Sequence, residues 1–123
     1  MQDNKIEITV RELKEHPSVC VASVTGSIDS YTARSFSQPI LSLTEYNVSV
    51  VIIDCGGITY VSSAGIGSFV ICADRFAEKG GLVLYNLQQN VLKIFTMLNM
   101  ASFFNISKTR DEALEKALSL HNK

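Results

Sequence analysis

The sequence has no excess of charge of either sign and no long hydrophobic run. Lysine and arginine number 11 and aspartate and glutamate 12 among 123 residues, which gives a net charge of -1. This balance provides no field to attract nucleic acid or acidic lipid. The longest apolar runs, such as Val50 to Ile53, are much shorter than the ~18 residues of a membrane span. The N-terminus has no apolar segment of a secretory signal. We therefore expect no membrane span, no secretion and no direct nucleic-acid partner.

Cysteine and histidine are also scarce. Cys20, Cys55 and Cys72 lie far apart among apolar neighbours and form no CxxC pair, which disfavours a zinc site or a redox dithiol. They are typical of buried thiols in a reduced, cytoplasmic compartment. The two histidines, His16 in a turn and His121 close to the C-terminus, have no obvious acid to orient them. A serine hydrolase would need such an oriented base. With no complete dinucleotide, phosphate-loop or nucleophile-elbow motif, we expect no enzyme, no cofactor and no metal.

The composition and length are those of one globular domain. Hydrophobic residues make up 46% of the chain and charged residues 19%, and a chain of this length has room for one core. We expect a single domain over residues 1–123.

Apolar periodicity predicts an α/β fold with the element order ββαβαβαβα. A turn at His16-Pro17 joins the first two strands, which should pair antiparallel. The later strands alternate with helices, and right-handed crossovers then give a mixed, largely parallel sheet packed by about four helices. A loop through Gly56 and Gly57 should follow the central strand. The strands are predicted at about 6–10, 19–24, 48–55, 82–85 and 103–106, and the helices at about 33–43, 62–77, 91–98 and 109–118.

The most informative segment is DCGGITYVSSAGIG, residues 54–67, in which a loop enters a helix. Ser62 or Ser63 can cap this helix by accepting hydrogen bonds from its first N–H groups. Alternatively, Gly65 and Gly67 leave the first turn open, so that a phosphate would meet free N–H donors and the positive end of the helix dipole. Asp54 is expected to bond the glycine loop.

Two stretches, TGSIDSYTA (residues 25–33) and VVIIDCGGITYVSSAGIG (residues 50–67), together with the element order, resemble the STAS family. The similarity is greatest to single-domain bacterial anti-sigma factor antagonists, whose hallmark is Asp-Ser-Ser/Thr-Gly-Leu-Gly at a helix start. Here Ser62 stands where the family usually has Asp, and Ala64 stands where a second Ser or Thr is usual.

The resemblance implies a phosphorylation switch. The position phosphorylated in the family corresponds to Ser63, with Ser62 as a rival acceptor. The implied partner-binding residues are Asp29, Ser62, Ser63, Ala64, Gly65, Ile66 and Gly67. The implied partners are an ATP-dependent serine kinase that acts as the anti-sigma factor, and a serine phosphatase that resets the switch.

Three alternatives remain open from the sequence. The pattern around Asp29 fits a residue of the turn before a helix as well as it fits a partner contact. The domain could instead be a STAS scaffold or regulatory subunit, for example of a lipid-transport complex, without control by phosphorylation. It could also bind a small anion at the helix N-terminus.

Overall fold

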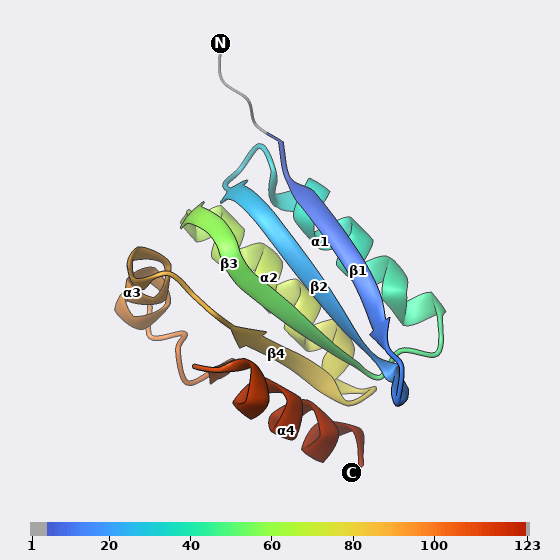
Figure 1. Cartoon of the computed structure of the whole chain (residues 1–123). Helices are drawn as coiled ribbons and strands as arrows, with labels where there is room; N and C mark the ends of the chain where they lie inside the picture. The colour runs from blue at the N-terminus through green and yellow to red at the C-terminus, as the bar shows by residue number, and fades with distance from the viewer. Residues whose placement is uncertain (1–4, 123) are drawn as a thin grey trace.

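The computed structural model describes residues 5–122 and confirms the predicted order of strands and helices (Figure 1). Within this range, the only element beyond the prediction is a short 3₁₀ helix, η1. The elements are β1 (Glu7–Leu13), β2 (His16–Ile28), α1 (Ala33–Ser42), η1 (Leu43–Glu45), β3 (Val50–Val61), α2 (Ser63–Ala77), β4 (Gly81–Tyr85), α3 (Gln89–Met97), β5 (Asn105–Ser107) and α4 (Arg110–His121).

The strands form one five-stranded sheet in the order β1-β2-β3-β4-β5. The pair β1 and β2 is antiparallel, and each later pair is parallel, as predicted. The central strands carry continuous apolar, β-branched sequence because both of their faces are covered. The order of the strands across the sheet is the same as their order along the chain.

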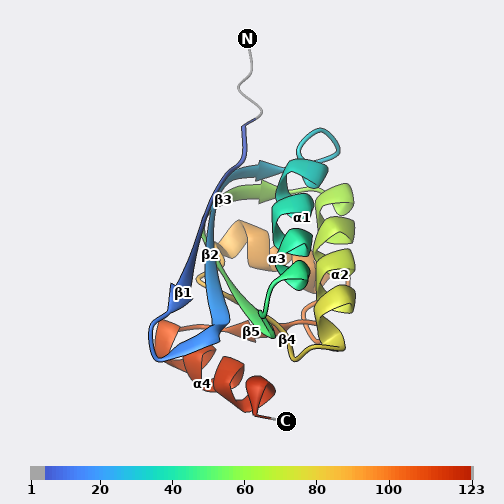
Figure 2. The ribbon, with the colours of Figure 1, turned by 90° about the vertical axis from the view of Figure 1, so that its right-hand side faces the viewer.

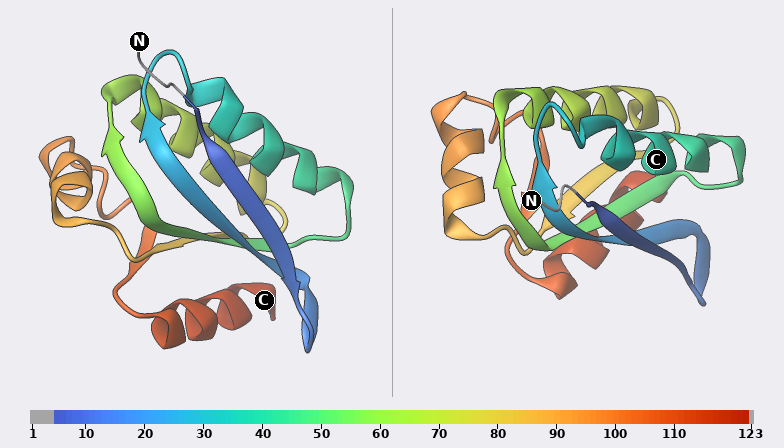
Figure 3. Two further views of the ribbon diagram at one scale, coloured as in Figure 1. Left: turned by 45° about the horizontal axis from the view of Figure 1, so that its top comes forward. Right: turned by 90° about the horizontal axis from the view of Figure 1, so that it is seen from above.

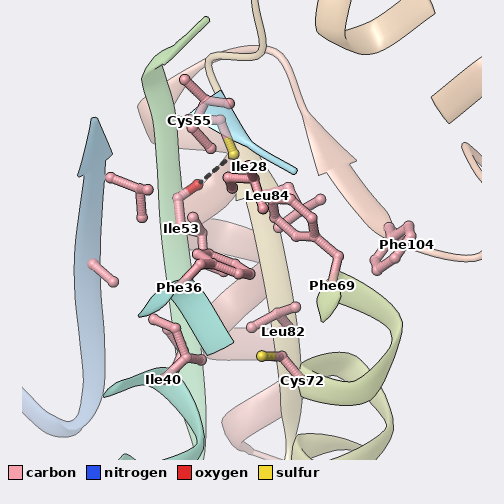
Figure 4. Packing of buried hydrophobic residues seen from close by; sticks show 14 of the residues in the cluster. Ile28, Phe36, Ile40, Ile53, Cys55, Phe69, Cys72, Leu82, Leu84 and Phe104 are labelled. Carbon is pink, nitrogen blue, oxygen red and sulfur yellow. Dashed lines mark hydrogen bonds between the residues drawn. The ribbon is translucent and has the colours of Figure 1, made fainter. Parts of the chain in front are cut away.

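Helices cover both faces of the sheet (Figures 2 and 3). On one face, α1, α2 and α3 enclose the larger core, in which the ring centroids of Phe36 and Phe69 lie 4.6 Å apart (Figure 4). The ring centroid of Phe95 lies 5.4 Å from that of Phe69. On the other face, α4 buries Ala113 and Ala117 against β2, β3 and β4. All three cysteines are buried and free, in agreement with their predicted role.

Two connections differ from the prediction. The turn of the first hairpin is at residues 14 and 15, so His16 and Pro17 begin β2. Proline is tolerated there because the strand has only just begun, next to a register irregularity at Leu13. Gly56 and Gly57 lie inside β3 and not in a loop after it. At Gly57 the neighbouring strand is so close that a β-carbon would be 2.8 Å from the carbonyl oxygen of Val24. Without side chains, β3 continues beside β2 through two register shifts.

The boundaries of the last strand also differ. It begins at Asn105 and not at Phe103, because the Phe104 side chain packs into the larger core and Phe103 is exposed. Thr109 caps α4 as predicted, accepting a hydrogen bond from the Glu112 backbone N–H at 3.1 Å. Helix α1 continues through Pro39 to Ser42.

Candidate partner-binding and phosphorylation site

The candidate site lies where β2 and β3 end side by side. Ile28 and Val61, the last residues of these parallel strands, are register partners. The chain leaves β2 into the loop before α1 and leaves β3 directly into α2. The Ser62 backbone N–H donates to the Ile28 carbonyl at 2.9 Å, which holds the two exits together. Sheet topology therefore brings residues 29 and 62–67 to one edge.

Ser62 is the N-cap of α2. Its backbone is extended, with φ -88° and ψ 176°, and its Oγ accepts from the Gly65 backbone N–H at 3.1 Å. Its carbonyl accepts from the Ile66 N–H at 2.8 Å. The capping function that the sequence allowed for either serine therefore belongs to Ser62, which is half-buried.

Ser63 is the first residue of α2, and its side chain is exposed. The first N–H groups of a helix have no intrahelical acceptor and form the positive end of the helix dipole. The Ser63 hydroxyl thus stands in solvent at an electropositive helix end. Ala64 and Gly67 are also exposed, and a β-carbon at Gly67 would meet no atom within 4 Å.

Gly65 and Ile66 are buried, contrary to the expectation that an open Gly65 serves an approaching molecule. A β-carbon on Gly65 would overlap the carbonyl oxygen of Ile28 and lie 2.8 Å from Val61 Cγ1. Gly65 is therefore required for the close packing of α2 against the end of β2. Only Gly67 is a glycine of the exposed surface in this turn.

Asp29 organises the loop between β2 and α1. Its Oδ1 accepts hydrogen bonds from the backbone N–H groups of Tyr31 at 2.9 Å and Thr32 at 3.1 Å. The buried Thr32 Oγ1 donates to the Ser27 carbonyl at 2.6 Å and accepts from the Asp29 N–H at 3.0 Å. The turn role allowed by the sequence is thus present. A contact of Asp29 with a partner stays a prediction.

Asp54 bonds the glycine segment as expected, accepting from the Gly56 N–H at 3.0 Å. It also accepts from Asn86 Nδ2 at 3.2 Å and from the Tyr85 hydroxyl at 3.3 Å. Burial, and then the Asp54 charge, raise the pKa of Tyr85. Asp54 therefore joins β3 to the end of β4, and its bonds lie away from Ser63.

The sequence prediction does not include two exposed apolar side chains on the elements that carry the site. Tyr31 is 82% exposed in the Asp29 loop, and Ile71 is 54% exposed on α2. Ile71 lies on the same side of the helix as Ala64 and Gly67, at helical spacing. The sequence does contain a signal for the exposure of Ile71, because this residue falls outside the apolar stripe of the helix. That stripe consists of Ile66, Phe69, Val70, Ala73 and Phe76.

Other kinds of site find no support in the described part of the chain. Between residues 5 and 122, no cluster of three or more His, Cys, Asp and Glu is arranged to hold a metal ion. No helix in the same range has the length and hydrophobicity needed to span a membrane.

Known proteins are similar to this chain both in sequence and in fold. The chain is 29% identical over 111 residues to the anti-sigma-B factor antagonist of Listeria monocytogenes, covering 87% of this chain and 91% of that protein. Its fold is similar to an anti-sigma factor antagonist from Mycobacterium paratuberculosis, with a TM-score of 0.83, 20% identity and coverage of 95% and 97%.

A third similar fold is that of the anti-sigma factor antagonist SpoIIAA in its unphosphorylated form, with a TM-score of 0.73, 16% identity and coverage of 92% and 97%. SpoIIAA of Bacillus is also known in a phosphorylated form, with a TM-score of 0.64. The family model of the STAS domain matches residues 11–113, which include both strand exits and the whole candidate site. The chain belongs to the STAS domain family.

Proposed function

We propose that this protein is an anti-sigma factor antagonist, controlled by phosphorylation of Ser63. The observation that carries the proposal is the different structural position of two adjacent serines. Ser62 is half-buried and caps α2, whereas Ser63 is exposed at the first position of the same helix. The Listeria relative, an anti-sigma-B factor antagonist, supports the assignment.

In the unphosphorylated state, the exposed surface around Ser63 binds an anti-sigma factor that is itself a serine kinase, and a sigma factor is released. This surface comprises the exposed Ser63, Ala64 and Gly67 and the half-buried Asp29 and Ser62, with the buried Gly65 and Ile66 setting its backbone. The protein acts as a binding partner in the cytoplasm and not as an enzyme. A serine phosphatase returns it to the binding state.

The switching step is a phosphoryl transfer. The Ser63 Oγ forms a bond to the γ-phosphorus of ATP bound to the kinase while the bond from that phosphorus to the β,γ-bridging oxygen breaks, ADP leaves, and the hydroxyl proton is released to solvent. The product carries about -1.5 to -2 charges at neutral pH. At the start of α2 this charge stabilises the helix by about 0.3–1 kcal/mol, so the domain stays folded.

The same charge disrupts the interface with the partner. A dianion pressed against a surface shaped for a neutral hydroxyl loses hydration and gains no matching counter-charge. A penalty of about 4 kcal/mol lowers affinity about a thousandfold. The modification therefore acts at the binding surface, with little change in the fold.

Ser62 is the poorer acceptor on structural grounds. A phosphate there would have to leave the half-buried cap position, because the Oγ is engaged by the Gly65 N–H. Losing this cap would cost about 1 kcal/mol. Ser63 has no such role in α2.

Two matched variants, Ser62→Ala and Ser63→Ala, test the proposal. Each is incubated with ATP and lysate of the source cell, and intact-protein mass spectrometry with site mapping follows. We expect one phosphate on the wild-type protein and on Ser62→Ala, and none on Ser63→Ala. Circular dichroism checks that both variants are folded, and a known substrate checks that the lysate is active. A phosphate on Ser62 would move the site, and no phosphate at all would favour the scaffold function.

Binding gives an independent test of the switch. Ser63→Ala should bind the kinase whether or not ATP is present, whereas the wild-type protein should dissociate after phosphorylation. Loss of kinase binding by a folded Ser63→Ala variant would contradict the mechanism.

A further inference from the structure

Within the part of the chain that the structure describes, the outer edge of β1 has no partner strand. In the sheet of residues 5–122, β1 is the terminal strand and pairs only with β2 (Figures 1 and 3). Its sequence is EITVREL, and every residue except Ile8 and Leu13 is exposed. An open edge of this length offers N–H and C=O groups to another strand, and native proteins usually cover or block such edges.

The strand is self-complementary about Thr9. If two copies of β1 run antiparallel with Thr9 opposite Thr9, Glu7 of each copy faces Arg11 of the other. On the opposite side of the strand, Ile8 faces Val10. Cross-strand pairs of opposite charge, of β-branched residues and of threonines each favour pairing. Two ion pairs and two apolar pairs thus form around one two-fold axis.

Neighbouring registers lose this match. Centring the pair on Val10 places Arg11 opposite Thr9 and Glu12 opposite Ile8. Centring it on Ile8 places Lys5 opposite Arg11, which repel each other. The charge pattern therefore selects the register centred on Thr9.

Faces of the strand are assigned by the hairpin register. Glu7 and Arg11 lie opposite Thr25 and Val21 of β2, and so share the α4 face of the sheet. Val10 lies opposite Ala22 on the other face, where it is 38% exposed and borders a cavity of about 510 Å³ with Leu43 and Tyr46. In the pairing centred on Thr9, Ile8 of the second copy covers this exposed Val10.

We propose that the outer edge of β1 binds a second copy of this chain, joining the two sheets into one through antiparallel β1 strands centred on Thr9. Because β2 separates β1 from β3, the pairing leaves Ser63 exposed in both copies. The interface is one strand wide, which places it among small, transient interfaces of less than ~1,200 Å². We therefore expect a monomer–dimer equilibrium.

Sedimentation equilibrium of the whole chain, from about 10 μM to about 1 mM, tests the proposal. We expect reversible dimerisation in the wild-type protein. Glu7→Arg and Arg11→Glu each replace two attractive pairs by two repulsive ones, and each should raise the dimer dissociation constant about tenfold or more. The charge-swapped double variant restores both pairs, and its dissociation constant should return to within about threefold of the wild type.

Glu12→Arg is the matched control. It makes the same change of charge on the same strand as Glu7→Arg, but its cross-strand neighbour would be the uncharged Ile6. Its dissociation constant should stay within about threefold of the wild type. Circular dichroism confirms the fold of each variant, and amide exchange of residues 7–11 should slow as protein concentration rises.

Three results would overturn the proposal. One is a wild-type protein that remains monomeric at about 1 mM. Another is a double variant as weak as the single ones. The third is a Glu12→Arg variant as impaired as Glu7→Arg, which would show an effect of net charge alone.

Discussion

Replacing Gly65 by alanine should destabilise the domain, although alanine is the better helix former. In an open helix the exchange of glycine for alanine gains about 0.5–1 kcal/mol. At Gly65 the new β-carbon would overlap the Ile28 carbonyl oxygen and lie 2.8 Å from Val61 Cγ1. The first of these neighbours is backbone and cannot rotate away. Helix α2 must therefore shift from the end of β2.

The magnitude follows from what the shift disturbs. Overpacking of a tight contact costs about 1–3 kcal/mol. The hydrogen bond from the Ser62 N–H to the Ile28 carbonyl, now 2.9 Å, contributes about 1 kcal/mol more. Subtracting the gain in helix propensity leaves a net loss of about 1–3 kcal/mol in the free energy of unfolding. Gly65→Val, with a larger side chain, should lose more.

Gly67→Ala is the internal control, because it is the same change two residues later in α2. Its β-carbon meets no atom within 4 Å, so the variant should gain about 0.5–1 kcal/mol. Urea denaturation followed by circular dichroism measures both free energies. A Gly65→Ala variant as stable as Gly67→Ala would refute the close packing of α2 on Ile28.

Two further predictions concern Asp29 and the buried thiols. Asp29→Ala removes the acceptor of two backbone N–H groups and should lower the free energy of unfolding by about 1–2 kcal/mol, whereas Asp29→Asn keeps an oxygen there and should lose less than about 0.5 kcal/mol. If Asp29→Asn nevertheless weakens kinase binding, the charge itself contacts the partner; equal losses of stability in both variants would contradict the loop role. Burial raises the pKa of Cys72 from 9.0 to about 12 and also raises the pKa of Cys55. Below pH 9.0 these thiols are protonated in both the folded and the unfolded chain, so they do not change the free energy of unfolding with pH. Above pH 9.0 the thiols ionise only in the unfolded chain, and the free energy of unfolding falls by at most about 1.4 kcal/mol per pH unit for each thiol. Urea midpoints should fall less steeply with pH in Cys72→Ala than in the wild-type protein, and identical slopes would count against this cause.

The sequence by itself determined the order of the elements and the sites of the helix starts. The run from Val50 to Ile53 is typical of a strand covered on both faces, and Thr109 with Glu112 indicates the start of α4. These features depend on residues close together in the chain, whose preferences are local. The antiparallel hairpin and the parallel crossovers follow from connection lengths.

Tertiary structure decided which of two equivalent residues takes which role. Ser62 and Ser63 are identical in type, and only the meeting of β2 and β3 makes one the cap and leaves the other exposed. Gly65 and Gly67 likewise appear interchangeable in the sequence, yet one packs against Ile28 and the other faces solvent. Residue 28 is far from residue 65 in the chain, so no local pattern carries this contact. The sequence predicts a loop at the glycines of β3 for the same reason, because their pairing partner β2 is distant in the chain. Local preference places a serine or a glycine near a helix start, but the neighbouring strand determines what each of them does there.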